Sequence, residues 1–225
     1  MPKRAGVARK AAGGQTLTER AYRELEERIV TLQLKPGKFL SEYALSNSLK
    51  IGRTPIREAL QRLSREDLVT ILPRKGILVS ETDPRKQLLV LEVRRELERL
   101  VCRLAAQRAT EAQRHRFREI ATSMDHAAKT NDDMMFMRLD RELNLLIAEA
   151  AKNDYASRAM RFLQGHSRRF WYLHYKQAAD LPLCARLHAN QGRAIAAGDA
   201  KAAAAASDRL NDYVVEFTRT TVTDF

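Results

Sequence analysis

The feature that most constrains this chain is the run Arg53-Thr54-Pro55-Ile56-Arg57-Glu58-Ala59-Leu60-Gln61-Arg62-Leu63. Thr54 is a preferred N-cap residue and Pro55 suits a first helical position, so the run predicts a short helix that begins here. Its apolar residues recur at helical spacing and predict one buried stripe, which comprises Ile56, Ala59, Leu60 and Leu63. One face of the helix is therefore expected to pack into a hydrophobic core, and the other to face solvent or a binding partner.

The outer face of this helix carries groups that suit DNA. Arg57 and Gln61 lie four residues apart and share a side, with Arg53 just before them. Arginine can make two hydrogen bonds to the edge of guanine, and glutamine can do the same to adenine, in the major groove. An ordinary solvated basic helix has the same pattern, because amphipathic helices are common. The surrounding sequence decides between the two.

The segments before this run predict two more helices. Thr16 and Glu19 form the pattern of a capping box, and the helix that they open ends at the turn Lys35-Pro36-Gly37. Ser41 caps a second, short helix, and Ile51-Gly52 makes a tight turn into the run described above. Two short helices joined by a turn that contains glycine are a helix-turn-helix.

A β-hairpin is predicted after the run. Residues 68–72 and 76–80 are rich in branched apolar residues and predict two strands, joined by Pro73-Arg74-Lys75-Gly76. This hairpin is a wing with a basic tip, so we expect residues 16–80 to form a winged helix-turn-helix. Residues 1–15 carry Lys and Arg among Ala and Gly without periodicity, which predicts a disordered basic arm that either touches phosphates or is a plain tail.

From Asp83-Pro84 onwards the pattern is helical and no strand is predicted. We expect an all-α bundle over residues 81–225, with six helices at 84–109, 111–129, 131–151, 154–178, 181–197 and 199–222. The first helix is expected to face the core through Val90, Val93, Leu97, Leu100 or Val101, and Leu104. The predicted fold class is thus mainly α, with one small hairpin.

Charge and composition agree with a DNA partner. Residues 1–80 contain 16 Lys/Arg and 8 Asp/Glu, whereas the remaining 145 residues contain 24 and 20. A compact basic surface is typical of a protein that binds a polyanion. No apolar run reaches the roughly 18 residues of a membrane span, and Cys102 and Cys184 have no metal or redox spacing. We therefore expect a soluble, cytoplasmic, nucleoid-associated protein with reduced thiols and no membrane partner.

Several motifs carry a family resemblance. Pro36-Gly37, Leu40-x-Glu42, the run from Gly52 to Leu63 and a wing with glycine resemble the DNA-binding domain of the GntR family of bacterial transcription regulators. The helical remainder resembles the FCD ligand-binding domain of the FadR subfamily. Its pieces are shorter but collinear: Glu92-Val93-Arg94-x-x-Leu97-Glu98, Leu139-Asp140-x-x-Leu143, Ala150-x-x-Asn153 and His188…Ile195-Ala196-Ala197-Gly198-Asp199. The resemblance covers about residues 17–220.

The helix pattern and the resemblance together assign the DNA contacts to Arg53, Thr54, Arg57, Gln61, Tyr43, Arg74, Lys75 and Gly76. The resemblance implies that the two helix arginines read bases and that the threonine, with nearby backbone N–H groups, holds phosphates. It places the wing tip in or near the minor groove. Tyr43 stands where some members have arginine, which alters one contact. Asp67 stands where glycine is usual before the wing, which should change only a turn.

The helix predicted over residues 131–151 carries two polar residues in an otherwise apolar stripe. Asp140 and Asn144 are four residues apart and therefore adjacent. Burying a carboxylate is costly unless a partner satisfies it, so the pair predicts a polar cavity, a metal or an arginine partner. His188, on another predicted helix, is a candidate companion.

The resemblance also bears on a metal. The FCD resemblance implies a metal site made of one Asp and three His. Asp140 and His188 match two of these four positions. Asn144 stands at the first His position, and Leu210 or Asn211 at the last. An amide is a weaker donor than imidazole and leucine is none. A divalent metal on Asp140, Asn144 and His188 is therefore one option, and a hydrogen-bonded pocket without metal is the favoured one.

Arg94 completes the predicted effector site with Asp140, Asn144 and His188. It is either a bidentate clamp for a small carboxylate or the ion-pair partner of Glu98, four residues on. Five further residues could belong either to the pocket or to a dimer surface, and the sequence does not decide between the two. They are His166, Arg168, Arg169, Trp171 and His174.

These features predict a homodimer that binds an inverted-repeat operator in double-stranded DNA and is released by a small organic acid. One alternative is a DNA-binding regulator that needs no effector, and a second is a nucleoid or RNA-binding architectural protein that binds by charge alone. Another is a metal-dependent enzyme. The sequence has no nucleophile–base motif, glycine-rich phosphate loop or His-x-x-x-His pair to support an enzyme.

Overall fold

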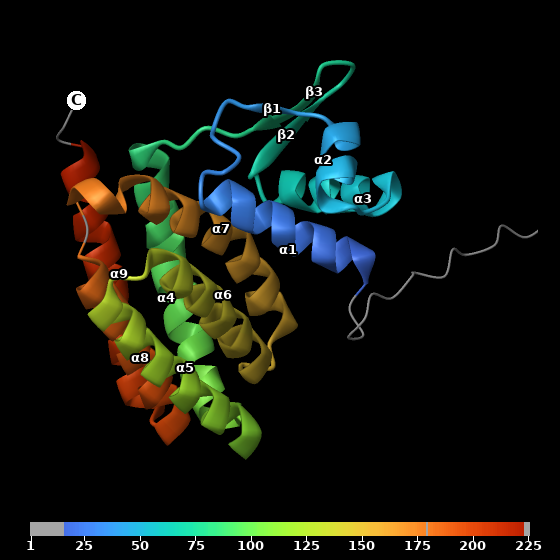
Figure 1. The fold of residues 1–225 in the computed structure, drawn as a ribbon. Helices are drawn as coiled ribbons and strands as arrows, with labels where there is room; N and C mark the ends of the chain where they lie inside the picture. The colour runs from blue at the N-terminus through green and yellow to red at the C-terminus, as the bar shows by residue number, and fades with distance from the viewer. Residues whose placement is uncertain (1–15, 179, 223–225) are drawn as a thin grey trace, which may run out of the picture. The chain divides into compact units, whose positions relative to one another are not determined.

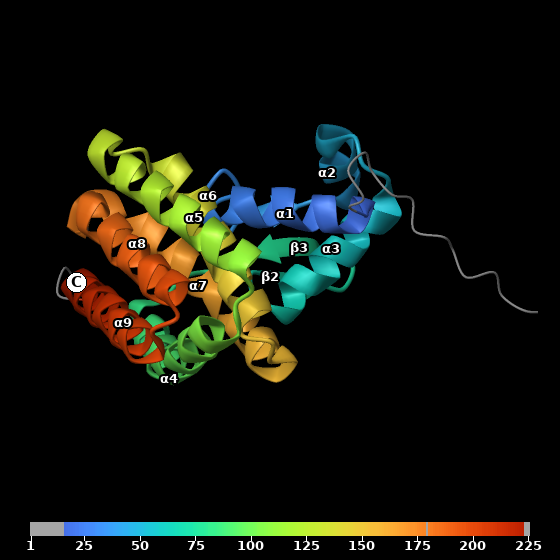
Figure 2. The same cartoon turned by 90° about the horizontal axis from the view of Figure 1, so that it is seen from below.

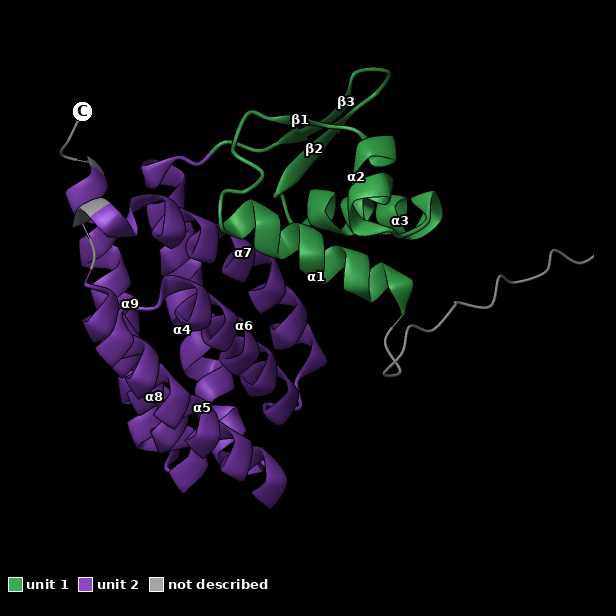
Figure 3. Cartoon of the chain, in the orientation of Figure 1, with its two compact units in different colours: residues 1–81 green, residues 82–225 purple. Residues whose placement is uncertain are grey.

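The structure, a computed structural model, describes residues 16–178 and 180–222. The chain divides into two compact units, residues 1–81 and residues 82–225 (Figure 3). The arm predicted over residues 1–15 lies outside the described residues.

The first unit is a winged helix-turn-helix, as predicted (Figure 1). Its elements are α1 (Leu17–Val30), β1 (Phe39–Leu40), α2 (Glu42–Leu49), α3 (Arg53–Arg65), β2 (Val69–Leu72) and β3 (Gly76–Val79). The strands form an antiparallel sheet in the order β1-β3-β2. Strand β1 was not predicted, because two residues are too few to show an alternating pattern. It adds a third strand through the pairing of Phe39 with Leu78.

The start of α3 differs from the prediction. The helix begins at Arg53 after Gly52, which makes no side-chain cap, so the prediction that Thr54 caps it is wrong. Its first backbone bond runs from the Ile56 N–H to the Gly52 carbonyl. Pro55 is tolerated as the third residue because the first N–H groups of a helix have no intrahelical acceptor. Ser41, by contrast, caps α2 as predicted and accepts from the Ala44 N–H.

The run around α3 is fixed in place by apolar packing and one buried polar cluster. The predicted stripe is buried throughout, and it comprises Ile56, Ala59, Leu60 and Leu63. Arg62 stacks over the Tyr22 ring at 3.6 Å and donates to Glu19 on α1 at 2.9 Å. The Tyr22 hydroxyl donates to Glu66 at 2.7 Å. These contacts join α1 to the end of α3 and explain the arginine within the run.

The second unit is an all-α bundle, as predicted (Figures 1 and 2). Its described helices are α4 (Pro84–Arg108), α5 (Glu111–Thr130), α6 (Asp133–Ala150), α7 (Asp154–Ala178), α8 (Leu181–Ala197) and α9 (Ala200–Val222). Helix α5 packs along α8, and α4 packs along α9. None of the described helices is long and apolar enough to cross a membrane.

The core-facing side of α4 matches the prediction at Val101, which is buried, but differs over most of the helix. Val93 is 54% exposed and Leu89 is 62% exposed, whereas Arg94 and Glu98 are buried. Gln87 is buried on the same inward row. Hydropathy misjudged this helix because its buried row carries polar groups that bond to one another inside the bundle. An apolar stripe is consequently left on the outside of α4.

Arg114 on α5 donates hydrogen bonds to backbone carbonyls near the C-terminal ends of α4 and α8. Its Nη1 donates to the carbonyls of Ile195 and Ala196 at 3.1 and 3.2 Å, and its Nη2 donates to Ala106 at 2.8 Å. Gly198, which ends α8, has a left-handed φ of 76°, and a Cβ there would lie 2.7 Å from Nη1 of Arg114. The glycine is therefore required both by its backbone conformation and by the arginine beside it.

Candidate DNA-binding face and candidate effector cavity

The outer face of α3 presents the predicted DNA-reading residues to solvent. Arg53, Arg57 and Gln61 are all exposed. Glu42 on α2 accepts two hydrogen bonds from Arg57, at 2.9 Å from Nε and 2.7 Å from Nη2. The Nη2 of Arg53 lies 3.9 Å from the same carboxylate. Hydrogen bonding from Arg57 lowers the pKa of Glu42, which stays charged and holds both arginines at the helix start.

The predicted wing residues lie at the β2–β3 turn. Arg74 and Lys75 are exposed, and Arg74 and Gly76 both have positive φ values, of 64° and 107°. Tyr43 follows Glu42 on α2 and is 67% exposed. Asp67 has a φ of 52°, a left-handed conformation that glycine adopts without strain.

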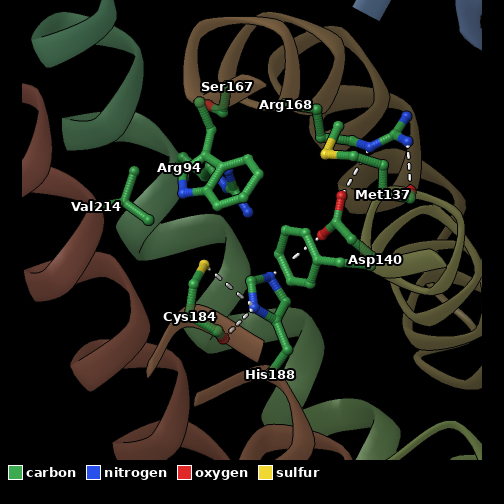
Figure 4. A pocket seen from close by; sticks show the side chains of 10 residues that line it. Arg94, Met137, Asp140, Ser167, Arg168, Cys184, His188 and Val214 are labelled. Carbon is green, nitrogen blue, oxygen red and sulfur yellow. Dashed lines mark hydrogen bonds and ion pairs between the residues drawn. The ribbon is translucent and has the colours of Figure 1, made fainter. Parts of the chain in front are cut away.

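The predicted effector residues meet around one small cavity in the second unit (Figure 4). Its walls come from α4, α6, α7, α8 and α9 and comprise Arg94, Phe136, Met137, Asp140, Ser167, Arg168, Trp171, Cys184, His188 and Val214. The cavity volume is about 30 Å³. That is room for two or three waters at roughly 10–15 Å³ each. Asn144 does not line the cavity, but its amide donates to Asp140 at 2.8 Å.

Asp140 is the centre of the buried polar contacts. Its Oδ2 accepts from Nε of Arg168 at 2.7 Å, and its Oδ1 lies 3.2 Å from Nε2 of His188. Burial alone would raise the pKa of Asp140, but the bond to His188 and the charge of Arg168 outweigh it and lower the pKa to about 2. The carboxylate is therefore ionised and fully partnered, as its low exposure requires.

His188 faces an acceptor with each ring nitrogen. Its Nδ1 lies 2.8 Å from the Cys184 carbonyl, and its Nε2 faces Asp140. Burial opposes the charged form, but Cys184 and Asp140 together raise the pKa of His188 well above its ordinary value. Two acceptors require two N–H donors, so the ring is an imidazolium.

Arg94 makes the predicted ion pair and also faces the cavity. Its Nε donates to Glu98 at 2.8 Å, and both side chains are buried. Among the described residues, no acceptor takes a hydrogen bond from its two terminal nitrogens. The two alternatives drawn from the sequence are therefore compatible, because one edge of the guanidinium pairs with Glu98 and the other remains for a ligand.

Arg168 is the main residue whose role could not be assigned from the sequence. It lies on α7, 28 positions from Asp140, and its Nη2 also donates to the Met137 carbonyl at 2.7 Å. The signal for an arginine partner was the buried carboxylate itself. The buried carboxylate did not indicate which of the arginines is its partner.

The residues present do not fit a divalent metal. Both oxygens of Asp140 and both nitrogens of His188 are directed at hydrogen-bond partners, and the Asn144 amide donates rather than offering its oxygen. Leu210 is apolar, and Asn211 donates to Glu98 at 3.3 Å. The guanidinium of Arg168 supplies the positive charge that a metal would bring to the carboxylate. No group of three potential ligands gathers within the part of the chain that the structure describes.

Comparisons with known proteins agree with this architecture. The FCD domain model matches residues 89–212, and the model for bacterial regulatory proteins of the gntR family matches residues 17–79. The chain is 30% identical over 125 residues to the Nta operon transcriptional regulator of Aminobacter aminovorans, across 56% of this chain and 59% of that protein. It is 25% identical over 174 residues to the HTH-type transcriptional repressor RspR of Escherichia coli K12, across 77% of this chain and 76% of that protein.

A similar solved structure is E. coli McbR/YncC, with a TM-score of 0.78 over 92% of this chain and 99% of that one. At 20% identity this likeness shows the fold alone. The fold and the sequence matches define a winged helix-turn-helix transcription regulator with a helical second unit. The chain belongs to the GntR family of bacterial regulatory proteins, in the FadR-like subfamily that carries an FCD domain. This is a family of regulators, so the enzyme alternative does not apply.

Proposed function

We propose that this chain is a cytoplasmic, homodimeric repressor that binds an inverted-repeat DNA operator through residues 16–80 and leaves it when residues 81–225 bind a small organic acid. The observation that carries the proposal is the exposed face of α3. It combines Arg53, Arg57 and Gln61 with a basic wing tip on a winged helix-turn-helix. These side chains suit direct readout of base edges in the major groove.

The dimer is supported by the outward stripe of α4. Leu89 and Val93 are exposed, and the next residues in the row, Leu97 and Leu100, are half-buried. One helix-turn-helix contacts few bases, whereas two related by a two-fold axis read two half-sites. A second copy packed on this stripe would bury the apolar row and supply that axis.

The effector role is supported by the cavity around Arg94. A buried guanidinium with unused donors is a costly arrangement unless a ligand completes it. A carboxylate matches its fork with two parallel hydrogen bonds. Binding there would change DNA affinity by the coupling free energy between the two sites, typically ~1–3 kcal/mol.

The test starts with selection of DNA from a randomised duplex pool by the full chain, followed by anisotropy titrations on the enriched sequence. We expect an inverted repeat, and we expect Arg57→Ala to lose at least about tenfold in affinity for it, since one good base contact is worth ~1–3 kcal/mol. Arg103→Ala is the matched control, because Arg103 is an exposed arginine on α4. Light scattering reports the dimer throughout.

Two outcomes would contradict the proposal. If random DNA competes as well as the selected sequence, the chain binds by charge alone, and its affinity should then follow salt concentration only. If Arg57→Ala and Arg103→Ala weaken binding equally, α3 is not the recognition helix.

A further inference from the structure

The cavity contains three cationic side chains, but only one has donors to spare. Arg168 donates to Asp140 and to the Met137 carbonyl, and His188 is held between Asp140 and the Cys184 carbonyl. Arg94 uses Nε for Glu98, and its terminal nitrogens have no acceptor among the described residues. It is only 5% exposed. The site is therefore built to receive one anionic group at one position.

The net charge of the site also indicates a single anionic group on the ligand. Three positive side chains, Arg94, Arg168 and His188, face two negative ones, Asp140 and Glu98, which leaves a single positive charge. One carboxylate would neutralise it. A second carboxylate would leave a net negative charge in a buried place, which is unfavourable because burial penalises unpaired charge.

Away from Arg94 the wall is mostly apolar. Phe136 and Trp171 meet with ring centroids 4.8 Å apart, and Met137 and Val214 are also part of the wall (Figure 4). The polar groups of this wall are the Ser167 hydroxyl, which accepts from Gln87 at 3.1 Å, and the Asp140 carboxylate with its partners Arg168 and His188. The Nε1 of Trp171 is a buried donor with no hydrogen-bond partner among the described residues. A ligand tail with several hydroxyl groups would leave most of them without partners there, at a cost of roughly 1–3 kcal/mol each.

We infer that the effector is a small monocarboxylate with an apolar tail, bound with its carboxylate on the free edge of Arg94. The cavity volume of about 30 Å³, room for two or three waters, favours a small acid. A sugar acid would leave most of its hydroxyl groups without partners, a hydroxy acid gains at most the Trp171 Nε1 as a partner, and a dicarboxylate carries one charge more than the site balances. This inference rests on the proposed function, because it names the chemical class of the acid that the cavity senses.

The test is calorimetric titration of the full chain, free of DNA, with three matched probes. Propanoate is the apolar probe, lactate adds one hydroxyl to it, and succinate adds a second carboxylate group. We expect propanoate to bind at least about tenfold more tightly than either. Arg94→Lys should weaken propanoate about tenfold or more, because lysine can still pair with Glu98 but lacks the planar fork. Arg103→Lys, on an exposed position of the same helix, should leave binding unchanged.

The tail is tested separately at the wall. Val214→Thr keeps the shape of the side chain and adds a hydroxyl, so it should weaken propanoate and reduce its advantage over lactate. Circular dichroism melts confirm that each variant is folded.

The outcomes separate the two proposals. Tighter binding of lactate or succinate that still depends on Arg94 would overturn the apolar-tail class and leave acid sensing intact. If none of the three probes binds, or if Arg94→Lys binds propanoate as the wild type does, the Arg94 clamp is wrong, and with it the proposed effector cavity. Operator binding through α3 would survive either result.

Discussion

The guanidinium of Arg168 lies 2.7 Å from Oδ2 of Asp140, measured from its Nε, and both side chains are buried between α6 and α7. The imidazolium of His188 faces the other oxygen of the same carboxylate at 3.2 Å. One buried anion is thus held by two protein cations. This arrangement gives the centre of the cavity its charge balance without a metal.

Removing Arg168 should strongly destabilise the second unit. Arg168→Met leaves Asp140 with one cationic partner fewer, and breaking a buried pair from one side costs about 3–5 kcal/mol. The free energy of unfolding from urea titration is the measurement. Arg161→Met, at an exposed position of α7, should stay within about 0.5 kcal/mol of the wild type. Equal effects of the two substitutions would show that the Arg168–Asp140 pair contributes little.

Acid should unfold the wild type partly through Asp140. Its pKa is lowered from 3.8 to about 2 in the folded chain, so its stabilisation is complete above the unfolded value and is lost as the pH falls towards 2. The contribution is on the order of 2 kcal/mol, from 1.36 kcal/mol per pKa unit. Urea titrations between pH 4.5 and pH 2, chosen as roughly the window of the shift, should show a shallower loss for Asp140→Asn. Parallel curves would rule out this titration.

Glu42 should control how selectively α3 reads DNA. Glu42→Gln removes the carboxylate that holds Arg57 and Arg53, so both arginines become free to pair with any phosphate. We expect affinity for random duplex to rise several-fold and the ratio of operator to random affinity to fall about tenfold. Glu24→Gln, which removes the same charge from α1, is the control. An unchanged ratio would mean that the pair has no role in specificity.

Arg114 and Gly198 should be energetically coupled. Arg114→Ala removes bonds to three carbonyls and should cost about 1.5–3 kcal/mol. Gly198→Ala should cost about 1–2 kcal/mol from its left-handed φ, plus the contact with Arg114. In the double variant that contact is absent, so the two costs should sum to more than the measured total. Strict additivity in urea titrations would contradict the contact.

The outer stripe of α4 should hold the dimer together. Val93→Asp places a charge in the apolar row, and we expect light scattering to show a shift from dimer to monomer at micromolar concentration. Tyr155→Asp changes a residue of α7 that is 82% exposed and lies outside this stripe, so its dimer should persist. A Val93→Asp protein that stays dimeric would place the interface elsewhere.

The fold could be predicted closely because its signals are local. Cap residues such as Ser41 and Asp83 mark helix starts within the reach of one turn, and each predicted helix of the bundle ends within a few residues of the observed one. Strand β1 escaped prediction because it is defined by its pairing with β3. The inward face of α4 escaped because its polar residues bond to one another and to polar groups of other helices, which hydropathy cannot register.

The sequence predicted which polar residues form the candidate site. It did not predict which of them bond to one another. Asp140, Asn144 and His188 were recognisable as polar groups in helical patterns. That Arg168 takes the carboxylate and leaves Arg94 free depends on how α6, α7 and α4 pack together. The choice among several arginines is a property of the assembled bundle.

Helix α4 links the cavity to the DNA-binding unit along a short stretch of chain. Residues 80–83 connect β3 of the wing to its first turn, and Arg94 follows Pro84 by ten residues, or about 15 Å of continuous helix. Gln87, in between, bonds to Ser167 of the cavity wall. The helix that begins next to the connection from the wing is therefore the same helix that carries Arg94. A ligand on Arg94 would thus act on the same helix to which the DNA-binding unit is covalently joined.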